Sequence, residues 1–154
     1  MSLLGQKAPD FTLVNHKREK VSLASLTAAG RVVLAFYPAA FTGVCTKELC
    51  TFRDSLATLN NLKATVVGLS VDAPFSNAAF ATQNGLEFSL LSDYDRAVTR
   101  AYGVALDHFA GMPGYTASQR AVFIVSTDGT VTYEWIAPNP GVEPDYAAIQ
   151  AALA

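Results

Sequence analysis

Residues 31–50 read Arg-Val-Val-Leu-Ala-Phe-Tyr-Pro-Ala-Ala-Phe-Thr-Gly-Val-Cys-Thr-Lys-Glu-Leu-Cys, and they predict a buried strand followed by a helix. The first seven of these residues form a nearly continuous apolar run, which predicts a strand buried on both faces of a sheet. Pro38 ends that strand because proline cannot donate a ladder hydrogen bond. A helix is predicted over residues 42–61, with Thr42 as its N-cap. One apolar face of this helix carries Cys45, Leu49, Phe52, Leu56 and Leu59.

The other sequence patterns predict alternating strands and helices. Strands are predicted at residues 11–14, 21–23, 65–71, 89–91, 121–126 and 131–136. Helices are predicted at residues 74–84, 94–102 and 145–153. Residues 104–119 have no clear pattern, and a loop of that length is expected to line a site or an interface. Strand–helix alternation demands parallel pairing and the Asp128-Gly129 hairpin demands antiparallel pairing, so we expect a mixed sheet with helices on both faces.

Size and composition indicate a single domain over residues 1–154. Hydrophobic residues make up 51% of the chain and charged residues 16%, which supplies enough apolar material for a sizeable core. The net charge is −2 and no block of like charges is present, so binding to a nucleic acid backbone is not expected.

The chain is expected to act in the cytoplasm, away from the membrane. It does not start with a basic segment followed by an apolar run, as a secretory signal would. Its longest apolar stretch, residues 32–41, is shorter than the roughly 20 residues of a membrane helix. Thiols are kept reduced in the cytoplasm, where a cysteine pair is more often catalytic or metal-binding than structural.

Two cysteines, Cys45 and Cys50, are too few for a disulfide framework and too few alone for a four-ligand zinc site. His16 and His108 are isolated, and each is predicted to be a solvated loop residue. The sequence therefore implies neither a metal nor a cofactor.

Cys45 is predicted to lie in the first turn of a helix. Unpaired N–H groups and the positive end of the helix dipole favour a thiolate there, and the thiolate is the nucleophilic form. The alternative is inert packing, because cysteine is often buried and Cys45 lies on the apolar face.

The spacing between Cys45 and Cys50 has a mechanical consequence. On a regular helix, five residues give a rise of about 7.5 Å and a rotation of about 140°, so the Cα atoms lie roughly 8–9 Å apart. A disulfide needs about 7 Å or less. We therefore expect two states, a helix with two thiols and a locally unwound segment with a Cys45–Cys50 disulfide.

The segment resembles the peroxiredoxin family. The family pattern Pro-x-x-x-Thr-x-x-Cys is matched in register by Pro38, Thr42 and Cys45. Residues 8–11, 52–54 and 120–124 extend the resemblance along most of the chain. Cys50 is similar to the resolving cysteine of the peroxiredoxin Q group, the bacterioferritin comigratory proteins. The segment Phe-Thr-Gly-Val-Cys, residues 41–45, also resembles one-cysteine relatives of the alkyl hydroperoxidase E type.

The resemblance implies a thioredoxin-like fold with an N-terminal β-hairpin extension, and reduction of hydroperoxides. It implies that Cys45 attacks the peroxide and becomes a sulfenic acid, which Cys50 resolves as a disulfide. Thr42 would orient the peroxide, Arg120 would stabilise the developing charge, and Pro38 would shield the site from water. A dithiol such as thioredoxin would restore the thiols.

Simpler roles stay open for each residue. From the residues alone, Thr42 serves as a cap, Pro38 ends a strand and Arg120 lies on the surface at a strand start. Glu48 is predicted to be a solvated helix residue, with an arginine as a possible partner.

The function also has open alternatives. A redox-switched interaction protein shares the first chemical step, and a one-cysteine peroxidase needs no Cys50. A thioredoxin-like disulfide reductase is disfavoured by the lack of Cys-x-x-Cys. The resemblance allows a monomer or a homodimer. Tyr37, Phe41 and residues 104–119 are candidates to form an apolar entrance for organic peroxides.

Overall fold

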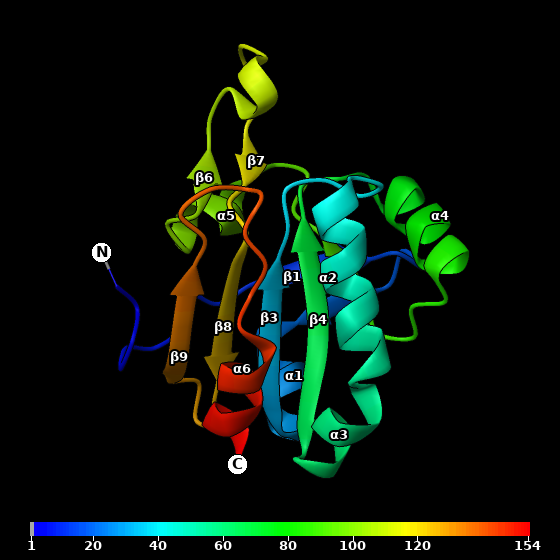
Figure 1. Cartoon of the computed structure of the whole chain (residues 1–154). Helices are drawn as coiled ribbons and strands as arrows, with labels where there is room; N and C mark the ends of the chain where they lie inside the picture. Colours follow the sequence, from blue (N-terminus) through cyan, green and yellow to red (C-terminus); the bar gives the residue numbers. More distant parts are fainter. Residues whose placement is uncertain (1) are drawn as a thin grey trace.

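The computed structural model describes residues 2–154, which build a mixed seven-stranded sheet with helices packed against it (Figure 1). The strand order is β2-β1-β5-β4-β3-β8-β9. The strands are β1 (Thr12–Asn15), β2 (Lys20–Ser22), β3 (Arg31–Phe36), β4 (Ala64–Ser70), β5 (Leu90–Ser92), β8 (Ala121–Val125) and β9 (Val131–Ile136). The helices are α1 (Leu23–Ala29), α2 (Gly43–Asp54), α3 (Leu56–Asn61), α4 (Pro74–Asn84), α5 (Ala97–Ala101) and α6 (Tyr146–Leu153).

The pairing pattern confirms the predicted mixed sheet. Strand β3 runs parallel to β4, and β4 runs parallel to β5. Strand β8 is antiparallel to both β3 and β9. The N-terminal hairpin β1–β2 joins the sheet through an antiparallel pairing of β1 with β5. This is the expected thioredoxin-like arrangement with its N-terminal hairpin extension.

Both faces of the sheet are buried, as the continuous apolar run of β3 predicts. Val33 and Ala35 belong to a core that includes residues of α2, α3, α4 and α6. Val32 and Leu34, which alternate with them, belong to a second core that includes residues of α1 and α5. The central strand is therefore shielded from water on both sides, and its carboxyl end is a rigid platform for the segment that follows.

Two of the predicted helices differ in the structure, and one helix was not predicted. The helix expected over residues 42–61 is broken at Ser55, whose φ and ψ of −93° and 1° separate α2 from α3. Helix α1 was not expected. Helix α5 begins at Ala97 rather than near residue 94, because Arg96 adopts a left-handed conformation with φ of 65°.

Residues 104–119, expected to be a loop, form a small hairpin of their own. Strand β6 (Ala105–Leu106) pairs with β7 (Ala117–Ser118), and a 3-10 turn, η1 (Phe109–Gly111), lies between them. We call residues 105–118 the arm. In Figure 1 the arm stands out from the body of the molecule, at the end where α2 begins.

Candidate active site

Cys45 lies in the first turn of α2, just beyond the carboxyl end of β3, and its side chain is fully buried. The connection from β3 is held in place by hydrogen bonds that its backbone N–H groups donate. The Tyr37 N–H donates to the Leu69 carbonyl at 2.9 Å, and the Ala40 N–H donates to Asp72 Oδ2 at 2.9 Å. The helix start is therefore fixed relative to the sheet, which confirms the predicted position of Cys45.

Arg120 immediately precedes β8, and its guanidinium group contacts the Cys45 thiol. Nη2 lies 3.3 Å from Cys45 Sγ, and Nη1 lies 2.9 Å from Glu48 Oε1. Nε and Nη2 also donate to the Pro140 carbonyl, at 3.2 and 2.8 Å. The side chain is only 2% exposed, so the interpretation of Arg120 as a surface residue is wrong. A cation fixed by three partners stabilises negative charge on the sulfur.

Glu48 is also fully buried, although the sequence predicted a solvated residue. One carboxylate oxygen pairs with Arg120, while Oε2 has no hydrogen-bond partner within residues 2–154. Burial raises the pKa of Glu48 to about 8, and the charge of Arg120 opposes this shift. A sequence signal was present, because Glu48 follows Cys45 by three residues and so shares its helix face.

Thr42 occupies the N-cap position of α2, as predicted, but its side chain does not cap the helix. Its hydroxyl donates to the Ala39 carbonyl at 2.7 Å. The capping role that the sequence favoured for this side chain is therefore wrong. The oxygen of the exposed hydroxyl retains lone pairs that accept hydrogen bonds.

A cavity of about 240 Å³ opens onto Cys45 and Arg120. Its walls bring together four of the five predicted site residues and parts of two distant segments. The lining residues are Pro38, Thr42, Gly43, Val44, Cys45, Phe109, Arg120, Pro140 and Gly141. Tyr37 is completely buried and Phe41 packs edge-on against Phe80, so neither forms this entrance.

Cys50 lies on the same helix as Cys45, five residues further on. It is half-buried, and its Sγ lies 3.7 Å from Asn84 Oδ1 at the end of α4. Arg53 fixes this part of α2 by donating from Nη1 to the Asn84 carbonyl at 2.6 Å. Both cysteines are free and α2 is continuous between them. This is the two-thiol helical state that the spacing predicts.

Neither histidine is among the residues that line this cavity. His16 lies in a turn, as predicted, but it is half-buried rather than fully solvated, and its Nδ1 accepts a hydrogen bond from the Leu90 N–H at 3.1 Å. His108 is exposed on the arm, as predicted. Within residues 2–154, no three or more His, Cys, Asp or Glu side chains gather as a metal site would require.

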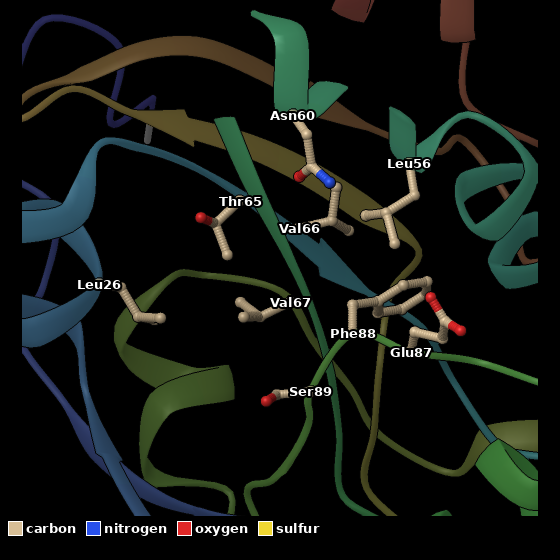
Figure 2. A pocket seen from close by; sticks show the side chains of 9 residues that line it. All are labelled: Leu26, Leu56, Asn60, Thr65, Val66, Val67, Glu87, Phe88 and Ser89. Atoms are coloured by element: carbon tan, nitrogen blue, oxygen red, sulfur yellow. The ribbon is translucent and has the colours of Figure 1, made fainter. Parts of the chain in front are cut away.

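A second cavity, of about 300 Å³, lies at the other end of β4 (Figure 2). It is lined by Leu26, Leu56, Asn60, Thr65, Val66, Val67, Glu87, Phe88 and Ser89. Thr65 lies near the amino end of β4, whereas Cys45 lies beyond the carboxyl end of the parallel neighbour β3. No cysteine or arginine lines this cavity. Cys45 and Arg120 line the cavity at the opposite end of the sheet.

The family of the chain follows from comparison with known proteins. The model of the AhpC/TSA family matches residues 4–134. The chain belongs to the AhpC/TSA family. It is 37% identical over 132 residues to the putative peroxiredoxin bcp of Coxiella burnetii, which covers 86% of this chain and 87% of that protein.

Two further similarities support the same family. The chain is 37% identical over 132 residues to alkyl hydroperoxide reductase E of Mycobacterium tuberculosis, over 84% of this chain and 82% of that protein. The crystal structure of peroxidoxin BcpB from Mycobacterium tuberculosis superposes with a TM-score of 0.87 at 31% identity, over 97% and 95% of the two chains. The expected peroxiredoxin of the bacterioferritin comigratory type is confirmed, and the chain is a thiol-dependent peroxidase.

Sequence reasoning missed one contributor to the peroxidase site. Pro140 acts through its backbone carbonyl, which carries no signal in the sequence. Phe109 belongs to residues 104–119, which were expected to line a site, and it does line this cavity. None of the helices within residues 2–154 has the length and apolar character needed to cross a bilayer.

Proposed function

We propose that Cys45 is the peroxidatic cysteine and that Arg120, Thr42 and Pro38 prepare it for reaction. The observation that carries this proposal is the 3.3 Å contact between Arg120 Nη2 and Cys45 Sγ at the wall of an open cavity. A thiolate is the nucleophilic form of cysteine, and a buried guanidinium stabilises it strongly because little water screens the charge.

The first step oxidises Cys45. The thiolate attacks the distal oxygen of a hydroperoxide, the S–O bond forms as the O–O bond breaks, and the sulfur becomes a sulfenic acid. The other oxygen leaves as an alkoxide or hydroxide and takes up a proton to become an alcohol or water. Arg120 stabilises the charge that develops on this oxygen, and the Thr42 oxygen accepts a hydrogen bond from the peroxide O–H. Pro38 keeps water from the sulfur.

The second step joins the two cysteines. The Cys50 sulfur attacks the sulfenic sulfur of Cys45, a disulfide forms and water leaves. Because both residues lie on continuous α2, this step requires unwinding of the helix between them. A dithiol of the thioredoxin type then reduces the disulfide by exchange. We place the reaction in the cytoplasm, where such a reductant keeps both thiols reduced, with the protein acting as a monomer or a homodimer.

One alternative is favoured by a specific observation. Alkyl hydroperoxide reductase E is as similar to this chain as the bcp relative is. A one-cysteine cycle, in which an external thiol attacks the Cys45 sulfenic acid directly, is therefore the second candidate. A redox-switched binding protein would share only the first step.

The test is peroxide consumption coupled to thioredoxin and thioredoxin reductase. We expect many turnovers for the wild type, none for Cys45→Ser, and loss of thioredoxin-coupled turnover with a persistent sulfenic acid for Cys50→Ser. Retained turnover in Cys45→Ser would exclude Cys45 as the nucleophile. Unchanged coupled turnover in Cys50→Ser would instead establish the one-cysteine cycle, and a single turnover in the wild type would favour the redox switch.

A further inference from the structure

The two cysteines of α2 face hydrogen-bonding groups of opposite kind. Cys45 Sγ lies 3.3 Å from Nη2 of Arg120, a cationic donor that favours the thiolate. Cys50 Sγ lies 3.7 Å from Oδ1 of Asn84, the last residue of α4, and an amide oxygen only accepts hydrogen bonds. Such an acceptor is satisfied by an S–H group and repels a thiolate, so it favours the neutral thiol. The same helix therefore holds its two sulfurs in environments that favour different protonation states.

The orientation of the Asn84 amide is fixed by a second contact. Its Nδ2 donates to the Phe80 carbonyl, one turn earlier in α4, at 3.0 Å. Exchanging the amide oxygen and nitrogen would place two oxygens against each other at Phe80, so Oδ1 is the atom that faces Cys50. The backbone of Asn84 is fixed as well, because its carbonyl accepts a 2.6 Å hydrogen bond from Arg53 Nη1. Contacts with both α2 and α4 therefore hold the acceptor beside the Cys50 sulfur.

Charged groups near Cys50 do little to offset this acceptor. Helix α4, which carries Asn84, has no charged residue between Pro74 and its end. On α2, Arg53 follows Cys50 by three residues and shares its face. The Arg53 guanidinium is paired with Asp54, from Nε to Oδ1 at 3.0 Å, and it is partly exposed to water, which screens its charge. The hydrogen bond to Asp54 raises the pKa of Arg53 more than a charge on Cys50 does, so the coupling between Arg53 and a Cys50 thiolate is the weaker interaction.

A neutral Cys50 thiol suits the order of the proposed reaction. Thiolates are the form that reacts with peroxides, so a Cys50 held as the thiol is not consumed while Cys45 is oxidised. Unwinding of α2 moves Cys50 away from Asn84, after which its proton is free to pass to water. The Cys50 thiolate then attacks the Cys45 sulfenic acid, the S–S bond forms as the S–O bond breaks, and the released hydroxide takes up a proton and leaves as water.

We propose that Asn84 is a positioning residue that holds Cys50 as a thiol until α2 unwinds. The inference rests on the proposed function, in which Cys45 is the nucleophile and Cys50 resolves its sulfenic acid. Asn84 acts through Cys50 and makes the reactivity of this sulfur depend on the state of the helix. In the sequence, the Asn84-Gly85 pair indicates only the end of a helix, because the partner of Asn84 lies 34 residues away.

The test measures how fast iodoacetamide alkylates Cys50 in a Cys45→Ser chain, where Cys50 is the only thiol. Asn84→Leu keeps the size of the side chain and removes the acceptor, whereas Asn84→Asp keeps an acceptor and adds negative charge. Both variants lose the side-chain contact with Phe80. Because the thiolate is the form that is alkylated, we expect the rate at neutral pH to be roughly two- to ten-fold higher in Asn84→Leu and lower by a similar factor in Asn84→Asp.

Two controls separate protonation from access to the sulfur. At alkaline pH, where Cys50 is ionised in every variant, the alkylation rates should converge, whereas a difference in access would persist. Gln83→Ala is the matched control on α4, because Gln83 is an exposed amide next to Asn84, and we expect its rate to equal that of the parent chain at both pH values.

The outcomes separate this inference from the proposed function. A loss of packing alone would shift both Asn84 variants in the same direction, whereas the proposed role shifts them in opposite directions. Equal rates, shifts of the same sign, differences that persist at alkaline pH, or an equal shift in Gln83→Ala would overturn the role of Asn84. None of these results bears on Cys45, because the alkylation uses no peroxide. Failure of the proposed function is detected separately, as retained peroxidase turnover in Cys45→Ser.

Discussion

At the scale of single residues, the site depends on one arginine that serves three partners. Arg120 contacts the Cys45 sulfur, a buried carboxylate and a backbone carbonyl. The sequence predicted Cys45 well because its signals are local, a strand end followed by a helix start. It did not predict the burial of Glu48, whose partner lies 72 residues away along the chain. Contacts of this range depend on how the whole chain folds, which helix periodicity does not encode.

Glu48 makes stability depend on pH. Burial raises its pKa to about 8 from an ordinary value of 4.5, so the folded protein retains a proton that the unfolded chain releases. The contribution of Glu48 to the free energy of unfolding is therefore greatest below pH 4.5, and this contribution is lost as the pH rises toward 8. The slope reaches about 1.4 kcal/mol per pH unit in the free energy of unfolding.

Replacing Glu48 by glutamine removes this contribution, because the amide does not titrate and its oxygen still accepts from Arg120. We expect denaturant unfolding of Glu48→Gln to show a flatter pH dependence between pH 5 and 8 than that of the wild type. Glu87→Gln is the matched control, since Glu87 is an exposed carboxylate at the distant cavity of Figure 2. Equal pH slopes in Glu48→Gln and the wild type would contradict the raised pKa.

At the scale of elements, the sequence predicted β3, β4, α4 and β9 closely but missed features that local patterns do not encode. The apolar spacing over residues 42–61 continues through the break at Ser55, so periodicity alone suggested one helix. Helix α1 has only seven residues, fewer than a periodic pattern needs. The two-residue strands of the arm are too short to produce a strand signal.

Helix α2 is the element whose unwinding should limit formation of the disulfide. Lys47 lies between the two cysteines, with a side chain 72% exposed that forms an ion pair with Glu143 at 3.0 Å. Replacement of Lys47 by alanine or by glycine removes the same ion pair. The two variants then differ in helix propensity by about 1 kcal/mol, which is about five-fold in an equilibrium constant.

We therefore expect the Cys45–Cys50 disulfide to form about five-fold faster in Lys47→Gly than in Lys47→Ala, because glycine favours the unwound helix. Overoxidation of Cys45 at high peroxide should fall in parallel, since faster resolution leaves less sulfenic acid exposed to peroxide. Mass spectrometry of samples quenched after one equivalent of peroxide measures both products. Equal rates in the two variants would mean that unwinding of α2 does not limit the reaction.

At the scale of the whole molecule, we propose that residues 1–154 act as one thioredoxin-like domain. The two cores lie on opposite faces of one sheet and share its strands, since alternate residues of β3 enter each core. Unwinding at one end of α2 therefore disturbs packing that supports the entire sheet. Oxidation of the cysteine pair should therefore change the stability of the whole protein.

This coupling predicts that the disulfide lowers the stability of the protein. Closing so short a loop stabilises by about 2 kcal/mol through the unfolded chain. Unwinding exposes Leu49, which is fully buried, at a cost of about 1.5–3 kcal/mol. It also separates Glu48 from Arg120, and losing a buried hydrogen bond to a charged group costs about 1.5–3 kcal/mol. The losses exceed the gain.

We therefore expect the oxidised protein to melt roughly 2–16 °C below the reduced protein, since the net loss is about 1–4 kcal/mol and 1 kcal/mol shifts the midpoint by about 2–4 °C in a chain of this size. Circular dichroism during heating measures both midpoints, after treatment with one equivalent of peroxide or with a thiol reductant. In Cys45→Ser, which lacks the proposed nucleophile, the same treatments should leave the midpoint unchanged. A higher midpoint in the oxidised wild type would mean that the disulfide forms without unwinding α2, because only then would the stabilisation from loop closure be retained in full.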